Sequence, residues 1–146
     1  NNPVPNPINI TLTQKQVVDG QRIDDTISST NFKHFRNLLN RELFGTAYKR
    51  YGRQLSMLVV WENGAWHRHH LHAIIEKPDS LETEEFISLV IECWTKTRFG
   101  YREHHFEVPA DKDREFGWIN YCMKKRTKTE VSSSIDWANS TCFEHR

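Results

Sequence analysis

The feature that most restricts the fold is a pair of apolar runs separated by a polar segment near the middle of the chain. The first run, residues 53–64, reads RQLSMLVVWENG, and the second, residues 69–78, reads HHLHAIIEKP. The first run ends in Asn63-Gly64, a dipeptide typical of tight hairpin turns. Both runs are typical of buried strands. We therefore predict an antiparallel hairpin at the centre of the fold.

A strand and a helix are predicted before this hairpin. Ile8, Ile10 and Leu12 alternate with polar residues, which indicates a strand with one buried face. Residues 31–52 carry apolar side chains at helical spacing and stop near a glycine, which indicates an amphipathic helix. The polar residues 14–30 between them are expected to form an irregular loop.

The pattern repeats after the hairpin. Residues 80–100 predict a second helix, residues 101–109 a short strand and residues 113–128 a third helix. The resulting order, β-α-β-β-α-β-α, is that of the split βαβ arrangement of ferredoxin-like folds. We expect an α+β fold in which a central antiparallel sheet has helices on one face and the active site on the other.

Length and composition indicate one soluble domain. The chain has 146 residues, of which 37% are hydrophobic, and we expect a core over about 8–128 and a tail of uncertain structure over 129–146. Its three cysteines, Cys93, Cys122 and Cys142, lack a CxxC spacing, which argues against a disulfide framework and favours a reducing compartment. No apolar run has transmembrane length and no signal peptide is recognisable, so we expect no membrane partner. The expected location is the cytoplasm of a prokaryote or the nucleus of a eukaryote.

The second strand of the hairpin is rich in histidine. His70 and His72 are two residues apart, so their side chains project from the same face of a strand. Two neighbouring imidazoles can share a divalent ion if a third ligand is present, and Glu62 on the partner strand is the first candidate. His67 is a reserve third ligand. The alternative is that both histidines are polar residues on a solvated strand face.

A tyrosine with two lysines stands out in the third predicted helix. Tyr121 faces away from the apolar stripe of Ile119 and Met123, and Lys124 and Lys125 share its face. A tyrosine flanked by lysines can act as a nucleophile towards phosphorus, because the cations stabilise the phenolate or the leaving oxygen. Exposed Tyr-Lys pairs are also common on helices that have no such role.

Three motifs, in this order along the chain, resemble those of the HUH endonuclease superfamily. They are ITLT at residues 10–13, HLH at residues 70–72 and YCMK at residues 121–124, and the resemblance spans roughly residues 8–128. Within the superfamily, the chain looks like the single-tyrosine rolling-circle replication initiators (Rep) and related transposase nuclease domains. No second tyrosine follows Tyr121 at three or four residues, which separates it from the paired-tyrosine members.

The resemblance implies a mechanism. His70 and His72 would hold a divalent metal, Mg²⁺ or Mn²⁺, with Glu62 as the acidic third ligand. Tyr121 would attack a phosphodiester of single-stranded DNA and leave a 5′-phosphotyrosine link and a free 3′-hydroxyl, while Lys124 would position or neutralise the reacting group. The DNA would carry a hairpin or an origin sequence. Relatives often continue into a helicase, but this chain has no GKS or GKT phosphate loop, so a helicase or C-terminal domain would lie outside it.

Contacts with DNA must come from local clusters, because the formal net charge is only +1. The basic cluster beside Tyr121 includes Arg126 and Lys128, and Trp118 either packs the tyrosine or stacks a base. The polar face of the first strand offers Asn9, Thr11 and Thr13 as further DNA contacts. Other basic residues follow the first helix (Lys49, Arg50, Arg53) or flank the fourth strand (Arg98, Arg102, His104, His105).

Two other functions compete with the nuclease. A non-catalytic module could bind single-stranded nucleic acid on an RRM-like sheet, using Trp61, Trp66 and Phe106 as stacking residues. A structural zinc domain is the third reading, and the scattered cysteines count against it. The histidine pair with Glu62 and Tyr121 discriminates between these functions, because a binding platform does not need such a set.

Overall fold

The structure is a computed structural model that describes residues 6–62, 70–108, 133–135 and 139–140. Its elements follow the chain as β1 (Pro7–Gln14), β2 (Val17–Val18), β3 (Gln21–Arg22), α1 (Asp25–Phe44), α2 (Thr46–Tyr51), β4 (Met57–Glu62), β5 (His70–Glu76), α3 (Thr83–Thr95), β6 (Gly100–Glu107) and β7 (Ser133–Ile135). Four long strands and three helices make up most of the described chain, in agreement with the α+β class expected from the sequence.

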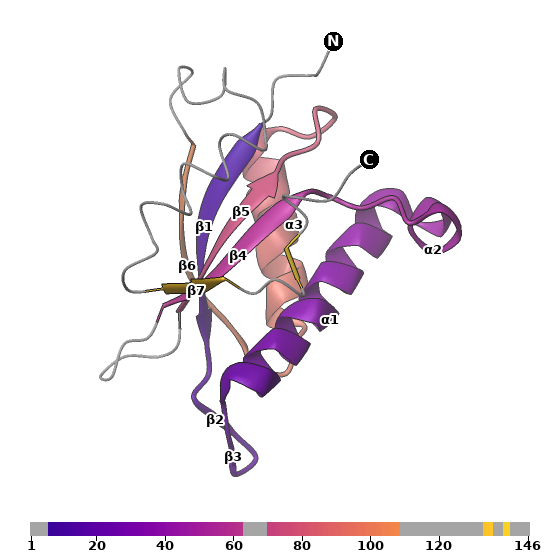
Figure 1. Ribbon diagram of the computed structural model, residues 1–146. Helices are drawn as coiled ribbons and strands as arrows, with labels where there is room; N and C mark the ends of the chain where they lie inside the picture. The colour runs from indigo at the N-terminus through magenta and orange to yellow at the C-terminus, as the bar shows by residue number, and fades with distance from the viewer. Residues whose placement is uncertain (1–5, 63–69, 109–132, 136–138, 141–146) are drawn as a thin grey trace.

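One antiparallel sheet organises these elements, with strand order β6-β1-β5-β4-β7. The chain runs from β1 through α1 to β4, and β5 lies between those two strands; it then runs from β5 through α3 to β6, and β1 lies between these (Figure 1). This is the split βαβ arrangement, so the ferredoxin-like prediction is confirmed. The pairing of β4 with β5 also confirms the central hairpin, whose turn lies outside the described residues.

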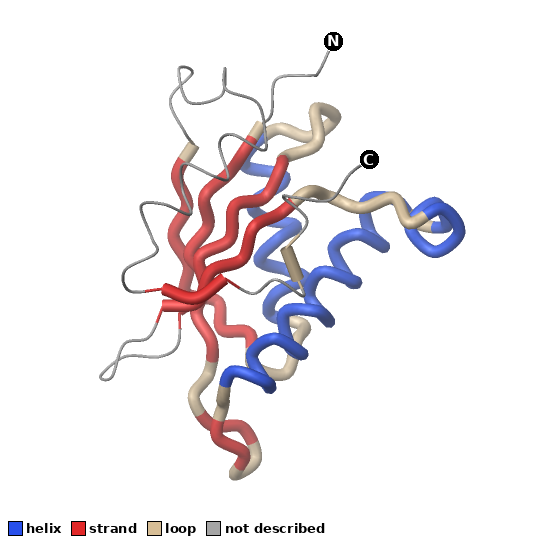
Figure 2. The backbone as a smooth tube through the Cα atoms, in the orientation of Figure 1, coloured by secondary structure: helices blue, strands red, loops and turns tan. Residues whose placement is uncertain are grey.

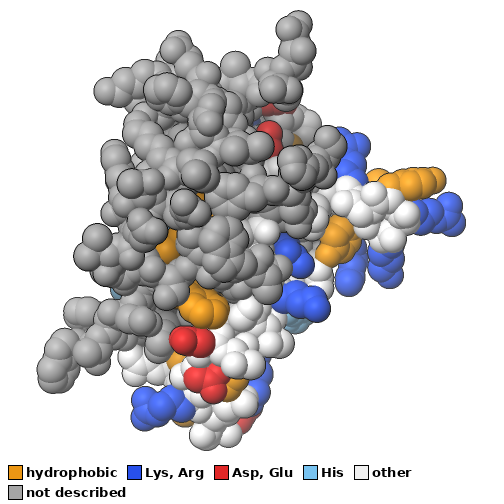
Figure 3. Space-filling model, viewed as in Figure 1, with side chains coloured by type: hydrophobic (Ala, Val, Ile, Leu, Met, Phe, Trp, Pro, Cys, Tyr) orange, Lys and Arg blue, Asp and Glu red, His pale blue; other side chains and the backbone are white. Residues whose placement is uncertain are grey.

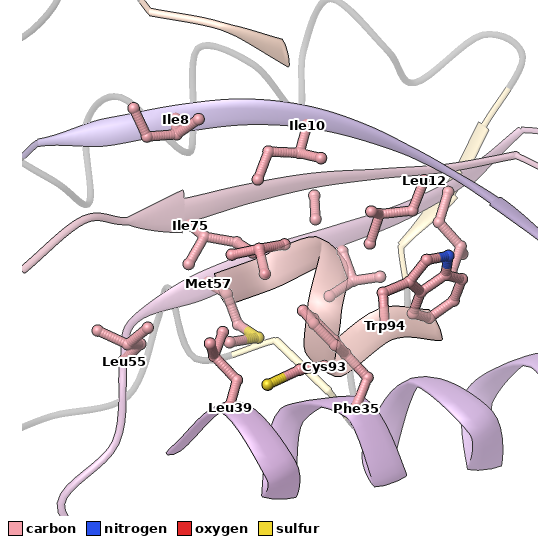
Figure 4. Close-up of a cluster of buried hydrophobic side chains, with 14 of the residues drawn as sticks. Ile8, Ile10, Leu12, Phe35, Leu39, Leu55, Met57, Ile75, Cys93 and Trp94 are labelled. Carbon is pink, nitrogen blue, oxygen red and sulfur yellow. The ribbon is translucent and has the colours of Figure 1, made fainter. Parts of the chain in front are cut away.

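Both long helices cover the same face of the sheet (Figure 2). Between this face and the helices lies a cluster of buried apolar side chains (Figure 4). Its fully buried members include Ile8, Ile10, Leu12, Phe32, Phe35, Leu39, Met57, Val59, Leu71, Ala73, Ile75, Phe86, Val90, Cys93 and Trp94. The apolar faces expected for the first strand and for both helices therefore form one core, whose burial supplies most of the driving force for folding.

Two buried asparagines on α1 attach this helix to its surroundings. The Asn31 amide donates to Thr97 Oγ1 at 3.1 Å, and its carbonyl accepts from the Phe99 N–H. The Asn40 carbonyl accepts the buried Leu55 N–H at 2.8 Å, immediately before β4. Each amide satisfies backbone or side-chain groups that would otherwise be buried without a partner. These hydrogen bonds attach α1 to the segment before β6 and to the segment before β4.

The expectations for residues 14–52 are wrong in two respects. Residues 14–30 are not an irregular loop, because β2 and β3 pair within them and α1 begins at Asp25. The Asp24 carboxylate accepts the Ile27 N–H at 2.8 Å, which is the N-cap contact that starts the helix. The helix also does not run unbroken to Gly52, since Gly45, with φ of 53°, ends α1 and separates it from α2.

The C-terminal part of the chain is described only in part. Residues 133–135 form β7, which pairs with β4 and adds an edge strand within the tail of uncertain structure. The helix predicted over residues 113–128 lies outside the described residues. Cys93 is buried and unpaired, and the other two cysteines lie outside the described residues.

Candidate functional site

The histidine strand presents different chemistry on its two faces. Leu71, Ala73 and Ile75 belong to the buried core, whereas the alternate residues His70 and His72 are half-buried on the opposite face. This alternation follows from the period of two along a strand. The expectation that both imidazoles share a face away from the core is therefore correct.

A row of residues across the sheet passes through His70. In the strand register, His70 is opposite Glu62 on β4 and opposite Thr13 on β1. Residues directly opposite one another share a face, with Cβ atoms roughly 4.5–5.5 Å apart. The backbone thus brings Glu62 into the row of His70, although the Glu62 side chain is not among those described.

The neighbouring row passes through His72. It is opposite Thr11 on β1 and Val60 on β4, and Thr11 Oγ1 lies 3.3 Å from His72 Nδ1. A hydroxyl at this nitrogen is the kind of outer contact that orients a histidine ring and selects its tautomer when the other nitrogen binds a metal. The structure brings Thr11 against the histidine, and its contact with DNA stays a prediction.

The row of His72 and Thr11 continues to His105 on β6. His105 is opposite Thr11, and its Nε2 lies 3.7 Å from Glu107 Oε1 two residues along the same strand. The sequence analysis placed His105 only in a basic cluster flanking this strand. Its alternation with Glu107 was visible in the sequence, but its position beside Thr11 depends on the β1–β6 register, which includes a shift between Leu12 and Thr13.

This face of the sheet is not open along its whole length. Leu58, Val60 and Ile74 lie on it and are nevertheless buried, although they do not belong to the core cluster. Thr13 is only 2% exposed, and its carbonyl accepts the Trp94 Nε1–H, while Asn9 is half-buried. The polar surface on this side is therefore concentrated around the two histidines and the neighbouring part of β6.

Two of the three aromatic residues considered for a stacking platform lie on the other face. Trp61 is opposite Leu71 and packs against the core cluster. Phe106 is opposite the core residue Ile10 and is 37% exposed at the edge of the sheet. Trp66 lies outside the described residues. Neither described aromatic can therefore contribute to a platform on the histidine face.

The structure leaves the tyrosine part of the predicted site undescribed. Outside the described residues lie His67, Trp118, Tyr121, Lys124, Lys125, Arg126 and Lys128. Among the described side chains, no group of three His, Cys, Asp or Glu residues is arranged to hold a metal ion. The described part of the predicted metal site is thus the pair of imidazoles, with the Glu62 backbone in register beside it.

No helix within the described ranges is both long enough and apolar enough to cross a bilayer. Comparisons of the chain with protein-family models, curated proteins and solved structures give no match.

Proposed function

We propose that this domain nicks single-stranded DNA and rejoins it through a covalent link to Tyr121, with the histidine face as its metal site. The observation that supports this most is the strand register: His70 and His72 share one face of β5, and Glu62 is directly opposite His70. Two imidazoles and a carboxylate from adjacent strands form a ligand set suited to a divalent ion that keeps positions open for phosphate oxygens.

In this proposal the residues of the face have separate roles. His70, His72 and Glu62 would hold Mg²⁺ or Mn²⁺, which would supply Lewis-acid polarisation of the scissile phosphate. Thr11 keeps the His72 ring oriented through the 3.3 Å contact at Nδ1. The half-buried position of both histidines favours binding, since fewer ring orientations must be lost when a ligand set forms.

The covalent step is assigned to Tyr121. Its phenolic oxygen forms a bond to phosphorus while the bond from phosphorus to the 3′ oxygen breaks. The phenol proton goes to solvent, and the departing 3′ oxygen takes up a proton from solvent. Lys124 and Lys125 lower the energy of the phenolate and of the phosphate as charge develops. The reverse reaction, attack by a 3′-hydroxyl on the phosphotyrosine, joins DNA ends, as rolling-circle replication or transposition requires.

A non-catalytic RRM-like module is less well supported by the fold. Such a module stacks bases on aromatic residues of its open sheet face. In this structure Trp61 and Phe106 are in register with core residues instead. The described polar face carries histidines, threonines and Tyr101, which is opposite Thr13. This arrangement is better suited to ligating a metal than to stacking bases.

The decisive experiment detects the covalent adduct. Pools of single-stranded DNA with random hairpins, labelled at the 5′ or 3′ end, would be incubated with the protein and Mn²⁺ and separated on a denaturing protein gel. We expect a labelled adduct that requires the metal, disappears with chelator and is absent in Tyr121→Phe. Retention of the label from the 3′ side of the cut identifies a 5′-phosphotyrosine.

The outcomes separate the competing functions. If DNA is cut equally well by Tyr121→Phe without any adduct, water is the nucleophile and the tyrosine mechanism is wrong. If the protein binds the pool but neither cuts nor links to it across metals and sequences, a binding module is the better description. Tyr101→Phe tests the second tyrosine of this region, because Tyr101 is opposite Thr13 in the row of His70. An adduct that survives in Tyr101→Phe and is lost in Tyr121→Phe assigns the nucleophile to Tyr121.

A further inference from the structure

A basic surface that is separate from the histidine face lies beyond the C-terminal end of α1. We define the α2 surface as Lys49, Arg50, Tyr51 and Arg53, all of which are exposed. Tyr51 is 79% exposed, which is unusual for a large aromatic side chain without a ligand. Figure 3 shows Lys and Arg side chains gathered on this side of the molecule, where α2 projects in Figure 1.

The cations of the α2 surface differ from other basic residues of the described chain in their ion pairs. Within the described ranges, Lys49, Arg50 and Arg53 form no ion pair, whereas Lys96 pairs with Glu92 at 3.4 Å and Arg98 with Asp19 at 3.9 Å. The chain contains no acidic residue between Glu42 and Glu62. Three positive charges within five residues, without nearby acids in sequence, create a local positive field on a protein whose net charge is only +1.

Local contacts hold this short helix in place. The Tyr48 hydroxyl donates to the Asn37 carbonyl on α1. At its end, Gly52 adopts a left-handed conformation with φ of 66°, and its N–H donates to the Tyr48 carbonyl at 3.2 Å. The exposed side chains therefore project from a fixed backbone, and less freedom is lost when they bind a ligand.

Arg53 extends the surface towards a hollow in the protein. Its guanidinium lies over the Phe44 ring, 4.9 Å from the ring centroid, which keeps the charged plane in one orientation. Both residues line a hollow of about 610 Å³ at the end of the sheet, whose charged lining also includes Lys77 and the acidic Glu76 and Asp79. This volume is within the roughly 300–1,000 Å³ of small-molecule sites. The charge and the concave surface are thus adjacent.

We propose that the α2 surface binds single-stranded nucleic acid, with phosphates on Lys49, Arg50 and Arg53 and a base stacked on Tyr51. Basic side chains with an interposed aromatic are the usual composition of a single-strand site, because the cations follow the backbone and the ring accepts any base. A membrane surface fits less well. The helix has only six residues and no wide apolar face, since its half-buried Ala47 and Tyr48 face the protein.

This inference rests on the proposed function in one respect, because it gives the DNA substrate of that proposal a second point of contact. The two sites lie at opposite ends of β4: Arg53 precedes Met57, and Glu62 ends the strand. The strand alone spans roughly 17 Å at about 3.3–3.4 Å per residue. A DNA strand that contacts both sites must extend well beyond the nucleotide that is cut.

The test measures binding without cleavage. Fluorescence anisotropy of a labelled, unstructured 30-nucleotide DNA would be recorded in chelator, with Tyr121→Phe as the parent protein. We expect Lys49→Ala/Arg50→Ala/Arg53→Ala to weaken binding and to lower the slope of log affinity against log salt by about 2, since each lost phosphate contact removes about 0.7. Tyr51→Ala should weaken binding roughly fivefold to a hundredfold, and Tyr51→Phe should bind like the parent.

A matched control separates this surface from general charge. Lys15→Ala/Arg22→Ala/Lys33→Ala removes three exposed cations elsewhere and should leave the salt slope within about 0.5 of the parent. Equal slopes for the α2 variant and the parent would overturn the inference, even if the adduct assay succeeds. So would binding of phosphatidylserine vesicles that is lost in the α2 variant while its DNA affinity is unchanged. If the wild type forms no adduct in the cleavage assay while the α2 variant still loses DNA affinity, the surface is supported and the nuclease is rejected.

Discussion

The two faces of β5 differ in what their residues contribute. Leu71, Ala73 and Ile75 are buried among the helices, where their role is to fill the core. On the opposite face, His70 and His72 are half-buried and lie in rows with Glu62, Thr13 and Thr11. One strand of seven residues therefore serves stability on one side and candidate chemistry on the other.

Core residues and site residues alternate strictly along β5, but some residues on the histidine face are also buried and apolar. Ile74 and Leu58 are opposite one another on the histidine face and are buried, so the face is apolar at one end and polar at the other. On the helix side, the Trp94 indole donates a hydrogen bond to the Thr13 carbonyl, so the core also contacts the backbone of β1 in the row of His70. The candidate site therefore occupies two rows of the sheet and not an open face.

Removing a large side chain from the core face should have the greatest effect on stability. Trp94 is fully buried, stacks edge-on against Phe35 with ring centroids 5.5 Å apart, and donates to the Thr13 carbonyl at 3.0 Å. We expect Trp94→Ala to lower the free energy of unfolding by about 3–5 kcal/mol, as measured by urea denaturation. A loss below about 1 kcal/mol would mean that this core packs much less tightly than the contacts indicate.

Removing the histidines should have little effect on stability and a large effect on adduct formation. We expect His70→Ala/His72→Ala to change the free energy of unfolding by less than about 1 kcal/mol, because neither side chain is fully buried. Adduct formation should fall by more than the roughly 10–100-fold that is typical of outer contacts to a metal. His34→Ala, an exposed histidine on α1, is the control and should keep full activity. Normal adduct formation by the double variant would remove these histidines from the mechanism.

The contact between the two central strands should have an intermediate effect. Thr11→Val removes the hydroxyl that lies 3.3 Å from His72 Nδ1 and retains a similar shape. We expect Mn²⁺ affinity, measured by calorimetry without DNA, to weaken about tenfold. Thr11→Ser keeps the hydroxyl and should bind like the wild type. Equal affinities for all three proteins would show that Thr11 does not position the ring.

The smallest predicted effect is a pH dependence from the core face. Burial raises the pKa of the Cys93 thiol from 9.0 to about 11, and the Glu42 carboxylate acts in the same direction. Between these values the folded protein keeps a proton that the unfolded chain releases, so Cys93 should make stability decline as the pH rises from about 9 to 11. Unfolding curves at pH 8 and pH 10 should therefore differ less in Cys93→Ala than in the wild type. An equal difference in both proteins would contradict this linkage.

Local sequence patterns were sufficient for most of the fold. The alternation of Ile8, Ile10 and Leu12 and the two apolar runs of the hairpin specify strands, because burial of one face imposes a period of two. The helix start does not follow from the apolar spacing, because Asp24 lies in a polar stretch and only its carboxylate, which accepts the Ile27 N–H, marks the N-cap. The break at Gly45 was missed because the apolar spacing around it allows a continuous helix.

By itself, the sequence determined the α+β class, the order of the main elements and the placement of His70 and His72 on one face of a strand, since these depend on local periodicity. Only the tertiary structure decided that Thr11 contacts His72, that His105 lies beyond Thr11, and that Trp61 and Phe106 are on the core side. These placements depend on the register between strands that are distant in the chain. Register is set by how all the side chains pack together, and no single segment encodes it.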